Sequence, residues 1–426
     1  MMIRRLLFAL LALSLSAAGC GPEGETDDDA GFPPIETADA GDSSDAGPDA
    51  DANADGGDTD AADPRVPIPE AGPYNVGYME FEVTYQGRQD GTDEERELNV
   101  SVWYPTNAEE GSNARYLDGA LSQEEFSDMK AYDEAEPADI GEMPLLVFSH
   151  GNGGIAEQNF FMTELWATRG WVIVSPDHTG NTIKSGASIN LEAAIYRPQD
   201  ITAVLDHVYS LPDEHPLSGR VSEEKVAMSG HSFGGYTTLA SSGASYAVDD
   251  LRSQCDSGTI NEDYCKVFDK GMRPKMFKEG FYDDRIKVAI PQTPAGALIF
   301  QEGLADIQIP TMLMTGGQDQ TLPNAEEGDP IWQMMKGSEH RRLNLPRGGH
   351  FTFSNMCDLF GTIEQVKNDG CGENFVETQK AYDIINTYSL AFVRYHLFDD
   401  MTAKEIIDGS RYPEGMGELE LSVGAD

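Results

Sequence analysis

Basic residues are scarce in this chain. Its 426 residues include 29 lysines and arginines against 74 aspartates and glutamates, which gives a formal net charge of −45 at pH 7. A chain of this charge repels the phosphate backbone, so we expect no nucleic-acid partner. The acidity does not by itself indicate a cationic substrate, and a need for solubility outside the cytoplasm is the better interpretation.

The N-terminus lacks an apolar run of membrane-spanning length, because the run at residues 6–15 is too short. It follows Arg4 and Arg5 and precedes small residues and Cys20, which is the layout of an export signal. The Gly-Cys ending resembles a bacterial lipoprotein processing site. We therefore expect residues 1–20 to be a signal that ends at a lipidated Cys20, with an ordinary cleaved signal as the alternative. The expected location is the bacterial cell envelope, with the lipid anchor as the contact with a membrane.

Large apolar residues are nearly missing from residues 21–70, which are rich in Asp, Ala, Gly, Pro and Ser. Such a segment cannot bury enough surface to offset its conformational entropy. Its repeated Asp-Ala pattern has no regular period, which argues against a calcium-binding repeat. We predict a disordered acidic linker here, followed by one folded domain at residues 71–426.

Cysteines are few as well. Besides Cys20 there are four, namely Cys255, Cys265, Cys357 and Cys371. No C-x-x-C spacing or attendant pair of histidines accompanies them, which argues against a metal site. An even number in an exported domain indicates disulfides, and of the three connectivities we predict Cys255–Cys265 and Cys357–Cys371.

The chain does contain a motif with a chemical meaning, at residues 225–235 (KVAMSGHSFGG). An apolar strand enters a glycine-rich turn and a helix leaves it, with Ser232 at the apex. Gly230 and Gly234 must lack side chains for the strand and the helix to approach, and the strain exposes the serine hydroxyl. The amide of Phe233 then faces a bound carbonyl oxygen. A glycine-rich turn with an incidental serine is the alternative.

A serine hydroxyl needs a base to take its proton as it attacks. Of the 8 histidines, His350 lies in a glycine-flanked loop after the last strand and before the terminal helix. His150 and His231 lie inside the two glycine motifs, where bracing of the loops is the better interpretation. We therefore predict His350 as the base of Ser232.

The histidine in turn needs a carboxylate that orients its ring. Asp319 directly follows the predicted strand at residues 311–315, where a loop at the carboxyl end of a strand presents it. Glu327 is also in range, but we interpret it as a surface charge. The resulting order is Ser232, Asp319, His350.

An oxyanion hole needs two preorganised amides. Phe233 supplies the first. The second is expected from the His-Gly-Asn-Gly-Gly turn after the strand at residues 143–149, with Asn152 as the donor and with Gly151 and Gly153 shaping the turn. A purely structural glycine turn is the alternative.

The remaining periodicity predicts the fold. Alternating apolar residues at 78–85 and 97–104 indicate two antiparallel strands with a polar loop at 86–96, and residues 111–141 form a polar surface excursion. Buried strands are predicted at residues 143–149, 171–175, 286–291 and 311–315, and helices at 155–169, 198–211 and 382–397. This alternation implies a mostly parallel sheet with helices on both faces. The interval 245–284 is long enough for a cap or lid, or for an inert insertion.

With these pieces in place, the chain resembles a serine hydrolase of the α/β-hydrolase superfamily. It is most similar to bacterial proteins labelled predicted dienelactone hydrolases and to type II platelet-activating-factor acetylhydrolases, and more distantly to cutinase-like polyester hydrolases. The resemblance spans residues 78–398 and is carried by PLLVFSHGNGG, GWVIVSPDHTGNT, RPQDITAVLDHV, KVAMSGHSFGG, DDRIKVAIPQTP and IPTMLMTGGQDQTLP. True dienelactone hydrolases use a cysteine where this chain has Ser232, so their substrate does not carry over. The acetylhydrolase likeness implies short or oxidised acyl esters of phospholipids.

The sequence thus predicts that residues 71–426 are the catalytic domain of an exported serine carboxylic-ester hydrolase. It would act through an acyl-enzyme on short-chain or phospholipid-type esters, with no cofactor or metal. A peptidase or acyltransferase with the same triad, and a non-catalytic surface binding protein on a hydrolase scaffold, are the alternatives. Asp177 and His178 either line the pocket or brace its loop.

Overall fold

The computed structural model describes most of the predicted folded domain. The described residues are 68, 70–185, 192–269, 271–411, 413 and 417–425. The predicted signal at residues 1–20, with Cys20, and nearly all of the predicted linker at 21–70 lie outside them. Among the described residues, none of the helices combines the length and the apolar character that a membrane span requires.

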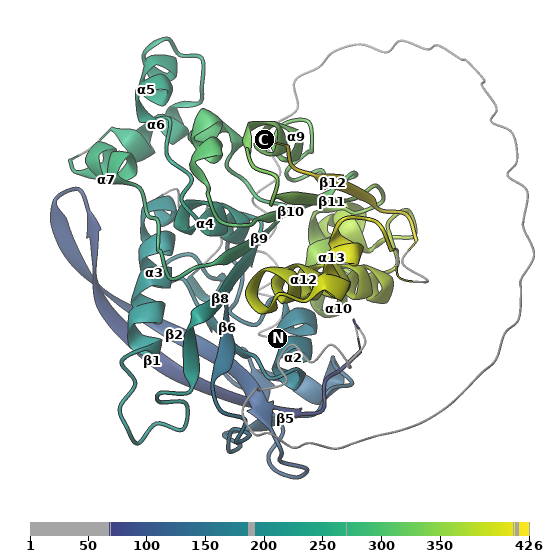
Figure 1. Cartoon of the computed structure of the whole chain (residues 1–426). Helices are drawn as coiled ribbons and strands as arrows, with labels where there is room; N and C mark the ends of the chain where they lie inside the picture. The colour runs from purple at the N-terminus through teal and green to yellow at the C-terminus, as the bar shows by residue number, and fades with distance from the viewer. Residues whose placement is uncertain are drawn as a thin grey trace, which may run out of the picture.

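A ten-stranded sheet runs through the centre of the molecule (Figure 1). Its strands are β1 (Asn75–Gln89), β2 (Thr92–Thr106), β5 (Ala131–Asp133), β6 (Met143–Ser149), β7 (Val172–Pro176), β8 (Val221–His231), β9 (Val288–Gln292), β10 (Met312–Gly316), β11 (Arg341–Leu345) and β12 (Glu420–Val423). Their spatial order is β12-β11-β10-β9-β8-β6-β7-β2-β1-β5. Pairing is parallel from β7 across to β11, whereas β2 joins β7, and β12 joins β11, in antiparallel fashion.

The central strands are the continuous apolar runs of the sequence. Every residue of β6, β7, β9 and β10 is buried. Strands of this kind read as unbroken hydrophobic segments because helices cover both of their faces. The parallel order of these strands brings their carboxyl ends to one edge of the sheet, which is where the predicted catalytic residues follow them.

The first two strands are longer than predicted. They pair without interruption from Asn75 opposite Thr106 to Gln89 opposite Thr92, so the polar loop predicted at residues 86–96 was wrong. The turn is the dipeptide Asp90-Gly91, and both residues have positive φ, at 46° and 82°. Asp-Gly is the sequence signature of a two-residue turn whose twist matches that of the flanking strands. Polar side chains along the outer half of the hairpin hid this pairing from a search for alternating apolar residues.

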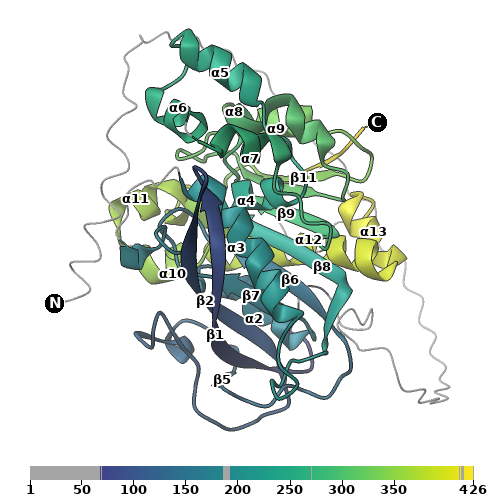
Figure 2. The ribbon, with the colours of Figure 1, turned by 90° about the vertical axis from the view of Figure 1, so that its left-hand side faces the viewer.

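Helices cover both faces of the sheet (Figures 1 and 2). On one face, α3 (Ala193–Val208) packs Ile201, Val204 and Leu205 against residues of β2 and β6. On the opposite face, α2 (Phe160–Thr168) and α12 (Thr378–Phe398) share one apolar cluster with the sheet. The remaining helices are α4 (Phe233–Ser241), α5 (Val248–Asp256), α6 (Glu262–Phe268), α7 (Arg273–Glu279), α8 (Ala297–Phe300), α9 (Gly328–Met334), α10 (Met356–Phe360), α11 (Glu364–Val366) and α13 (Met401–Ile407).

Pro198 lies inside α3 rather than at its start, because the helix begins five residues before the predicted position. Proline has no N–H, so the carbonyl of Ala194, four residues earlier, loses its helical donor. The hydroxyl of Tyr236 in α4 donates to this carbonyl at 2.8 Å. A side chain of the neighbouring helix therefore satisfies the carbonyl group that the proline leaves open.

The predicted surface excursion at residues 111–141 is partly buried, which corrects that prediction. It forms a small second sheet of β3 (Arg115–Tyr116) and β4 (Leu121–Ser122) and the edge strand β5. Tyr116 is buried, and its hydroxyl donates to the carboxylate of Glu164 at 2.6 Å and accepts from the indole of Trp103 at 2.9 Å. The segment is mostly polar and has no regular apolar pattern, so the sequence did not indicate that residues such as Tyr116 and Ala131 join the core.

The interval 245–284 folds into the helices α5, α6 and α7, and Cys255–Cys265 joins the first two as predicted. Leu251, Phe268 and Phe277 pack into the cluster that contains the apolar residues of α4. Both views place α7 beside the tip of the β1–β2 hairpin, where Arg273 Nε lies 2.8 Å from Asp90 Oδ1 (Figures 1 and 2). That this insertion acts as a lid stays a prediction.

Candidate active site

Ser232 occupies a strained turn between β8 and α4. Its φ of 60° and ψ of −116° are unusual for a residue with a side chain. The flanking glycines make the turn sterically feasible. A Cβ atom on Gly234 would lie 1.8 Å from the carbonyl oxygen of Ser149, and one on Gly230 would lie 2.4 Å from the oxygen of Gly234. The predicted strand, turn and helix are therefore present, with the serine at the apex.

The structure brings the three predicted side chains together from three separate loops. Ser232 Oγ lies 2.9 Å from His350 Nε2, and His350 Nδ1 lies 2.8 Å from Asp319 Oδ2. Ser232 follows β8, Asp319 follows β10, and His350 follows β11 at the start of a short 3-10 turn. Ser232 retains 9% of its surface exposed.

The electrostatics of His350 suit a proton acceptor. Burial lowers the pKa of its ring, but the charge and hydrogen bond of Asp319, together with the charge of Asp369, outweigh burial, so the net shift is upward. With its Nδ1 proton donated to Asp319, the ring presents the lone pair of Nε2 to the Ser232 hydroxyl. The histidine can therefore take the serine proton and hold the resulting charge beside a carboxylate.

His231 braces the loop of His350, the candidate base. Its Nδ1 accepts from the Gln158 side-chain amide at 2.8 Å, so its Nε2 carries the proton that is donated to the carbonyl oxygen of His350 at 2.9 Å. The other end of Gln158 accepts from the Gly151 amide at 2.9 Å. Burial, and then the nearby His350, lower the pKa of His231 well below its usual value, which keeps it neutral.

One of the two predicted oxyanion donors lies at a helix start. Phe233 is the first residue of α4, so its amide has no carbonyl to bond within the helix. It also lies at the positive end of the helix dipole.

The other predicted donor belongs to the turn after β6. A Cβ atom on Gly151 would lie 3.5 Å from Ser232 Cβ, so this turn runs directly beside the candidate nucleophile. Arg197 fixes its backbone by donating to the carbonyl oxygens of His150 at 2.6 Å and Gly151 at 2.9 Å. The Asn152 amide belongs to the same peptide plane as the Gly151 carbonyl, so Arg197 sets its orientation.

Arg197 and Gln158 are site residues that the sequence analysis missed. Arg197 is fully buried, and although burial lowers its pKa to about 9, it stays charged at neutral pH. The available signal in the sequence was its position one helical turn before the apolar residues 201, 204, 205 and 208 of the same helix. Gln158 carried no signal, because it binds a main-chain amide, that of Gly151, and a histidine 73 positions away.

Glu327 is not the surface charge that was predicted. Its carboxylate accepts from the amides of Gly296 and Ala297, both at 2.8 Å, at the start of α8. Burial raises its pKa, whereas those two amides act in the opposite direction.

A second Ser–His–Asp arrangement lies in the core. Ser149 Oγ is 2.8 Å from His178 Nε2, and His178 Nδ1 is 2.8 Å from Asp200 Oδ2. Asp200 also accepts from Arg96 Nε at 3.0 Å and from the Tyr85 hydroxyl at 2.6 Å. His178 therefore braces its loop and does not line a pocket, which decides between the two roles considered for it.

Comparison with known proteins gives a likeness at the level of the fold. No family model matches the sequence, and no curated protein is significantly similar to it. Among solved structures, a ferulic acid esterase from Streptomyces cinnamoneus matches with a TM-score of 0.57 and 21% sequence identity, over 83% of this chain and 98% of that one.

The fold is an α/β-hydrolase fold. In this fold the nucleophile, the acid and the histidine follow one another along the chain in that order, each after a strand of the parallel sheet. Ser232, Asp319 and His350 keep this order. The fold thus explains why Ser232 and His350, which are 118 positions apart, meet with Asp319 at one edge of the sheet.

Proposed function

We propose that this protein is a serine carboxylic-ester hydrolase that acts on small-molecule esters through an acyl-enzyme. The observation that carries the proposal is the hydrogen-bonded series from Ser232 Oγ through the His350 ring to Asp319, at 2.9 and 2.8 Å, with the serine on a strained turn. This is the arrangement that activates a hydroxyl group for attack.

The mechanism has two halves. Ser232 Oγ attacks the ester carbonyl carbon while His350 Nε2 takes the hydroxyl proton, and Asp319 stabilises the charged ring. The tetrahedral oxyanion accepts hydrogen bonds from the amides of Phe233 and Asn152. When the intermediate collapses, the bond to the alcohol breaks and His350 returns its proton to that alcohol.

Deacylation repeats these steps with water as the nucleophile. His350 takes a proton from the water, whose oxygen attacks the acyl carbon on Ser232. The second tetrahedral intermediate expels the serine oxygen, which regains the proton from His350. A carboxylic acid leaves and the enzyme returns to its starting state.

The similar solved structure is a ferulic acid esterase, which supports an ester as the substrate. The resemblance to type II acetylhydrolases favours short or phospholipid-type acyl esters. Two disulfides are typical of a protein outside the cytoplasm. Together with the expected lipoprotein signal, they favour a location in the cell envelope, with a lipid on Cys20 as anchor.

The proposal is tested with a fluorophosphonate probe and a panel of substrates. We expect the probe to label the intact protein and not Ser232→Ala. The panel contains nitrophenyl esters from acetyl to palmitoyl, methyl ferulate, a phosphatidylcholine with a short second chain, and a peptide nitroanilide. Faster hydrolysis of short esters than of the anilide supports the esterase. Preferential anilide cleavage indicates a peptidase, and absence of labelling indicates a non-catalytic binding protein.

The lipid anchor is tested separately in a bacterial host fed a radioactive or alkyne-bearing fatty acid. We expect the full chain to take up the label and the Cys20→Ala variant to lose it. Unlabelled, processed protein would show an ordinary cleaved signal instead.

A further inference from the structure

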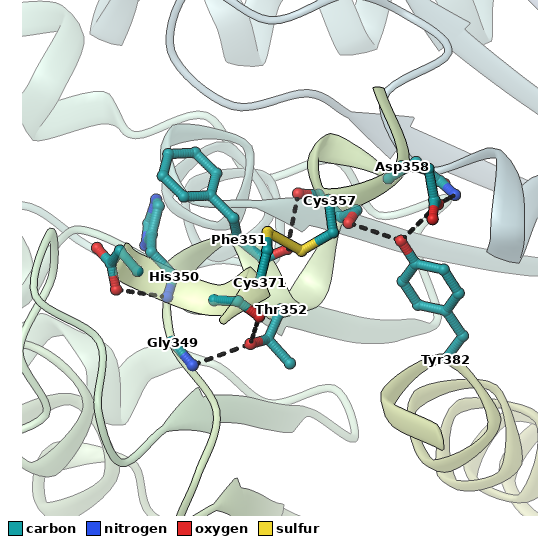
Figure 3. Close-up of a disulfide and its surroundings, with 12 residues drawn as sticks. Gly349, His350, Phe351, Thr352, Cys357, Asp358, Cys371 and Tyr382 are labelled. Carbon is teal, nitrogen blue, oxygen red and sulfur yellow. Dashed lines mark hydrogen bonds between the residues drawn. A yellow bond between two sulfur atoms is a disulfide. The ribbon is translucent and has the colours of Figure 1, made fainter. Parts of the chain in front are cut away.

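The segment between the catalytic histidine and α12 is closed into a loop by the disulfide Cys357–Cys371 (Figure 3). The loop contains α10, α11 and the irregular turn Lys367–Cys371. Figure 3 shows the disulfide beside the turn that carries His350, Phe351 and Thr352. None of this loop belongs to the triad itself, yet it lies directly against one of its members.

Asp369, two residues before Cys371, is buried and binds both loops that carry the partners of the nucleophile. Its Oδ1 accepts from the His350 amide at 3.0 Å and from the Gln320 amide at 3.0 Å. Its Oδ2 accepts from the amide and the hydroxyl of Thr321, at 3.0 and 2.7 Å. One carboxylate thus joins the histidine to the two residues that follow Asp319.

Close backbone contact fixes the position of this carboxylate. A Cβ atom on Gly349 would lie 2.6 Å from the carbonyl carbon of Asp369, and one on Gly370 would lie 2.6 Å from the Thr352 amide nitrogen. Gly370 has a φ of 148°, which favours glycine, and its carbonyl accepts from the Thr352 hydroxyl at 3.2 Å. The loop therefore packs against the histidine turn without side chains between the two backbones.

We propose that Asp369 is a positioning residue for the triad and that the Cys357–Cys371 disulfide keeps it in place, so that turnover depends on the oxidised state of that bond. The inference rests on the proposed function. Asp319 and His350 come from different loops, and the hydrogen bond between their side chains holds only while those loops keep a fixed spacing. Asp369 sets that spacing through four hydrogen bonds.

The charge of Asp369 acts on the pKa of His350, whereas a purely structural role of Asp369 would leave that pKa unchanged. The titratable groups that act on the His350 ring are Asp319 and Asp369, which raise its pKa, and His231, whose own pKa the ring lowers. Removing the charge of Asp369 therefore lowers the pKa of His350. Since the base must be neutral, the acid limb of the rate profile then moves to lower pH.

The first test is Asp369→Asn, which keeps the size of the side chain but loses its charge and one acceptor. We expect kcat to fall by roughly 10- to 100-fold with KM nearly unchanged, because small misplacements of catalytic groups cost about this much. The acid limb should also shift to lower pH. Wild-type kcat with an unshifted acid limb would overturn the proposal.

Asp358→Asn is the matched control from the same loop. The Asp358 carboxylate accepts from the Tyr382 hydroxyl at 2.8 Å (Figure 3) and from Asn355 Nδ2 at 2.7 Å. The amides of residues 320, 321 and 350 bond to Asp369 instead. We expect this variant to keep the kcat and the acid limb of the wild type. An equal loss in both variants would show a general effect of the loop and would count against Asp369.

A milder pair of variants keeps the test decisive if Asp369→Asn does not fold. Thr321 is exposed, and Thr321→Val removes only the hydroxyl that donates to Asp369, whereas Thr321→Ser retains a hydroxyl. We expect a severalfold loss of kcat in the valine variant and little change in the serine variant. Equal kcat in the two variants would overturn the proposal.

The role of the disulfide is tested against the other disulfide of the same chain. We expect Cys357→Ser with Cys371→Ser to lower kcat as Asp369→Asn does, and Cys255→Ser with Cys265→Ser to leave it unchanged. The Cys357→Ser/Cys371→Ser change is then combined with Asp369→Asn. The combined loss of kcat should be less than the product of the separate losses, because both changes act on the spacing between the loops of Asp319 and His350. Independent, multiplying effects would contradict this.

Reversible reduction gives the same test without mutation. Dithiothreitol reduces the disulfide to two thiols and is itself oxidised to its cyclic disulfide, a two-electron exchange. Activity should fall, and should return on reoxidation, in the Cys255→Ser/Cys265→Ser background. Fluorophosphonate labelling of the untreated wild type separates the two proposals. An unlabelled wild type refutes the esterase, whereas a labelled wild type with redox-insensitive turnover refutes only this inference.

Discussion

Two Ser–His–Asp arrangements with nearly equal hydrogen-bond lengths lie in this protein. In the candidate site, the serine–histidine and histidine–aspartate distances are 2.9 and 2.8 Å. In the core, Ser149, His178 and Asp200 are joined by bonds of 2.8 and 2.8 Å. The difference between the two is in their surroundings, since Ser149 is 0% exposed and ends a regular strand, whereas Ser232 is 9% exposed on a strained turn beside two candidate oxyanion donors.

The two histidines also differ in the direction in which their surroundings shift the pKa. Burial lowers the pKa of His178 well below its usual value, and the positive charges of Arg197 and Arg96 act in the same direction. His350 is equally buried, but its facing carboxylates reverse the effect and raise its pKa. Hydrogen-bond geometry alone therefore does not identify a catalytic triad. Substrate access, oxyanion donors and the ability of the histidine to hold a proton do so.

The largest expected effect is a loss of activity, and it should occur on replacement of Ser232 but not of Ser149. Ser232→Ala should abolish fluorophosphonate labelling and lower ester hydrolysis by about 10⁴-fold or more, because the nucleophile is removed. Ser149→Ala should keep the labelling. It should lower the free energy of unfolding by about 1–3 kcal/mol, because a buried partner of His178 is lost. Activity assays and urea unfolding measure the two effects, and loss of labelling in Ser149→Ala would contradict the comparison.

The two aspartates should differ in the quantity that they affect. Asp319→Asn should lower kcat by about 10³- to 10⁴-fold, because the ring is then held in the wrong tautomer. Asp200→Asn should instead destabilise the fold by about 3–5 kcal/mol, since it leaves the buried Arg96 without its partner. Steady-state kinetics and thermal unfolding check both variants. A kcat loss in folded Asp200→Asn as large as that in Asp319→Asn would remove the distinction.

The pH dependence should separate the two histidines. Since the pKa of His350 is raised above the ordinary value of about 6.5, kcat/KM should fall about tenfold per pH unit once the pH drops below that raised pKa. His178 should remain neutral there. Its lowered pKa means that its contribution to stability is present above about pH 6.5 and is lost as the pH falls further. Rate profiles and NMR titration of the histidine rings measure both, and protonation of His178 before His350 would refute the assignment.

The smallest expected effect concerns the side chain of Asn152, in the turn after β6. This turn carries the second candidate oxyanion donor and has no counterpart in the core arrangement. Asn152→Ala keeps the backbone amide and removes a side chain whose Oδ1 accepts from Asn181 at 2.8 Å. We expect kcat to change by about threefold or less, against the roughly 10²- to 10³-fold loss typical of deleting an oxyanion donor. A hundredfold loss would indicate that the side chain of Asn152, and not its amide, contacts the oxyanion.

Much of the fold could be predicted because its signals are local. The apolar run of β6 and the glycines around Ser232 can be recognised in the sequence. Asp319 could be predicted because it directly follows an apolar strand. The pairing of the outer β1–β2 hairpin was missed because its strands are polar on both faces. The turn Asp90-Gly91 contained the signal for it.

The supporting residues of the site could not be predicted, for a different reason. Arg197 bonds to backbone carbonyls some 46 and 47 positions away, and Asp369 bonds to Thr321 at a separation of 48. The carbonyls and amides that they bind are present in every residue, so no sequence pattern marks these contacts. Only the assembled fold shows which carbonyl or amide each one meets.

The long hairpin leaves an open edge that the molecule must protect. β5 pairs with β1 only over Val76, Gly77 and Tyr78, although β1 continues to Gln89. Beyond Tyr78, none of the described strands pairs with this edge, and the Gln199 side chain binds the main chain of Arg88 near its end. An unpaired edge of that length is a template for a further strand from another molecule. Glu80 and Glu82 are exposed along it, in a chain with a formal net charge of −45. We therefore expect mutual repulsion between such edges to oppose the stacking of one molecule on the next, a consequence of the acidic composition that does not involve the candidate site.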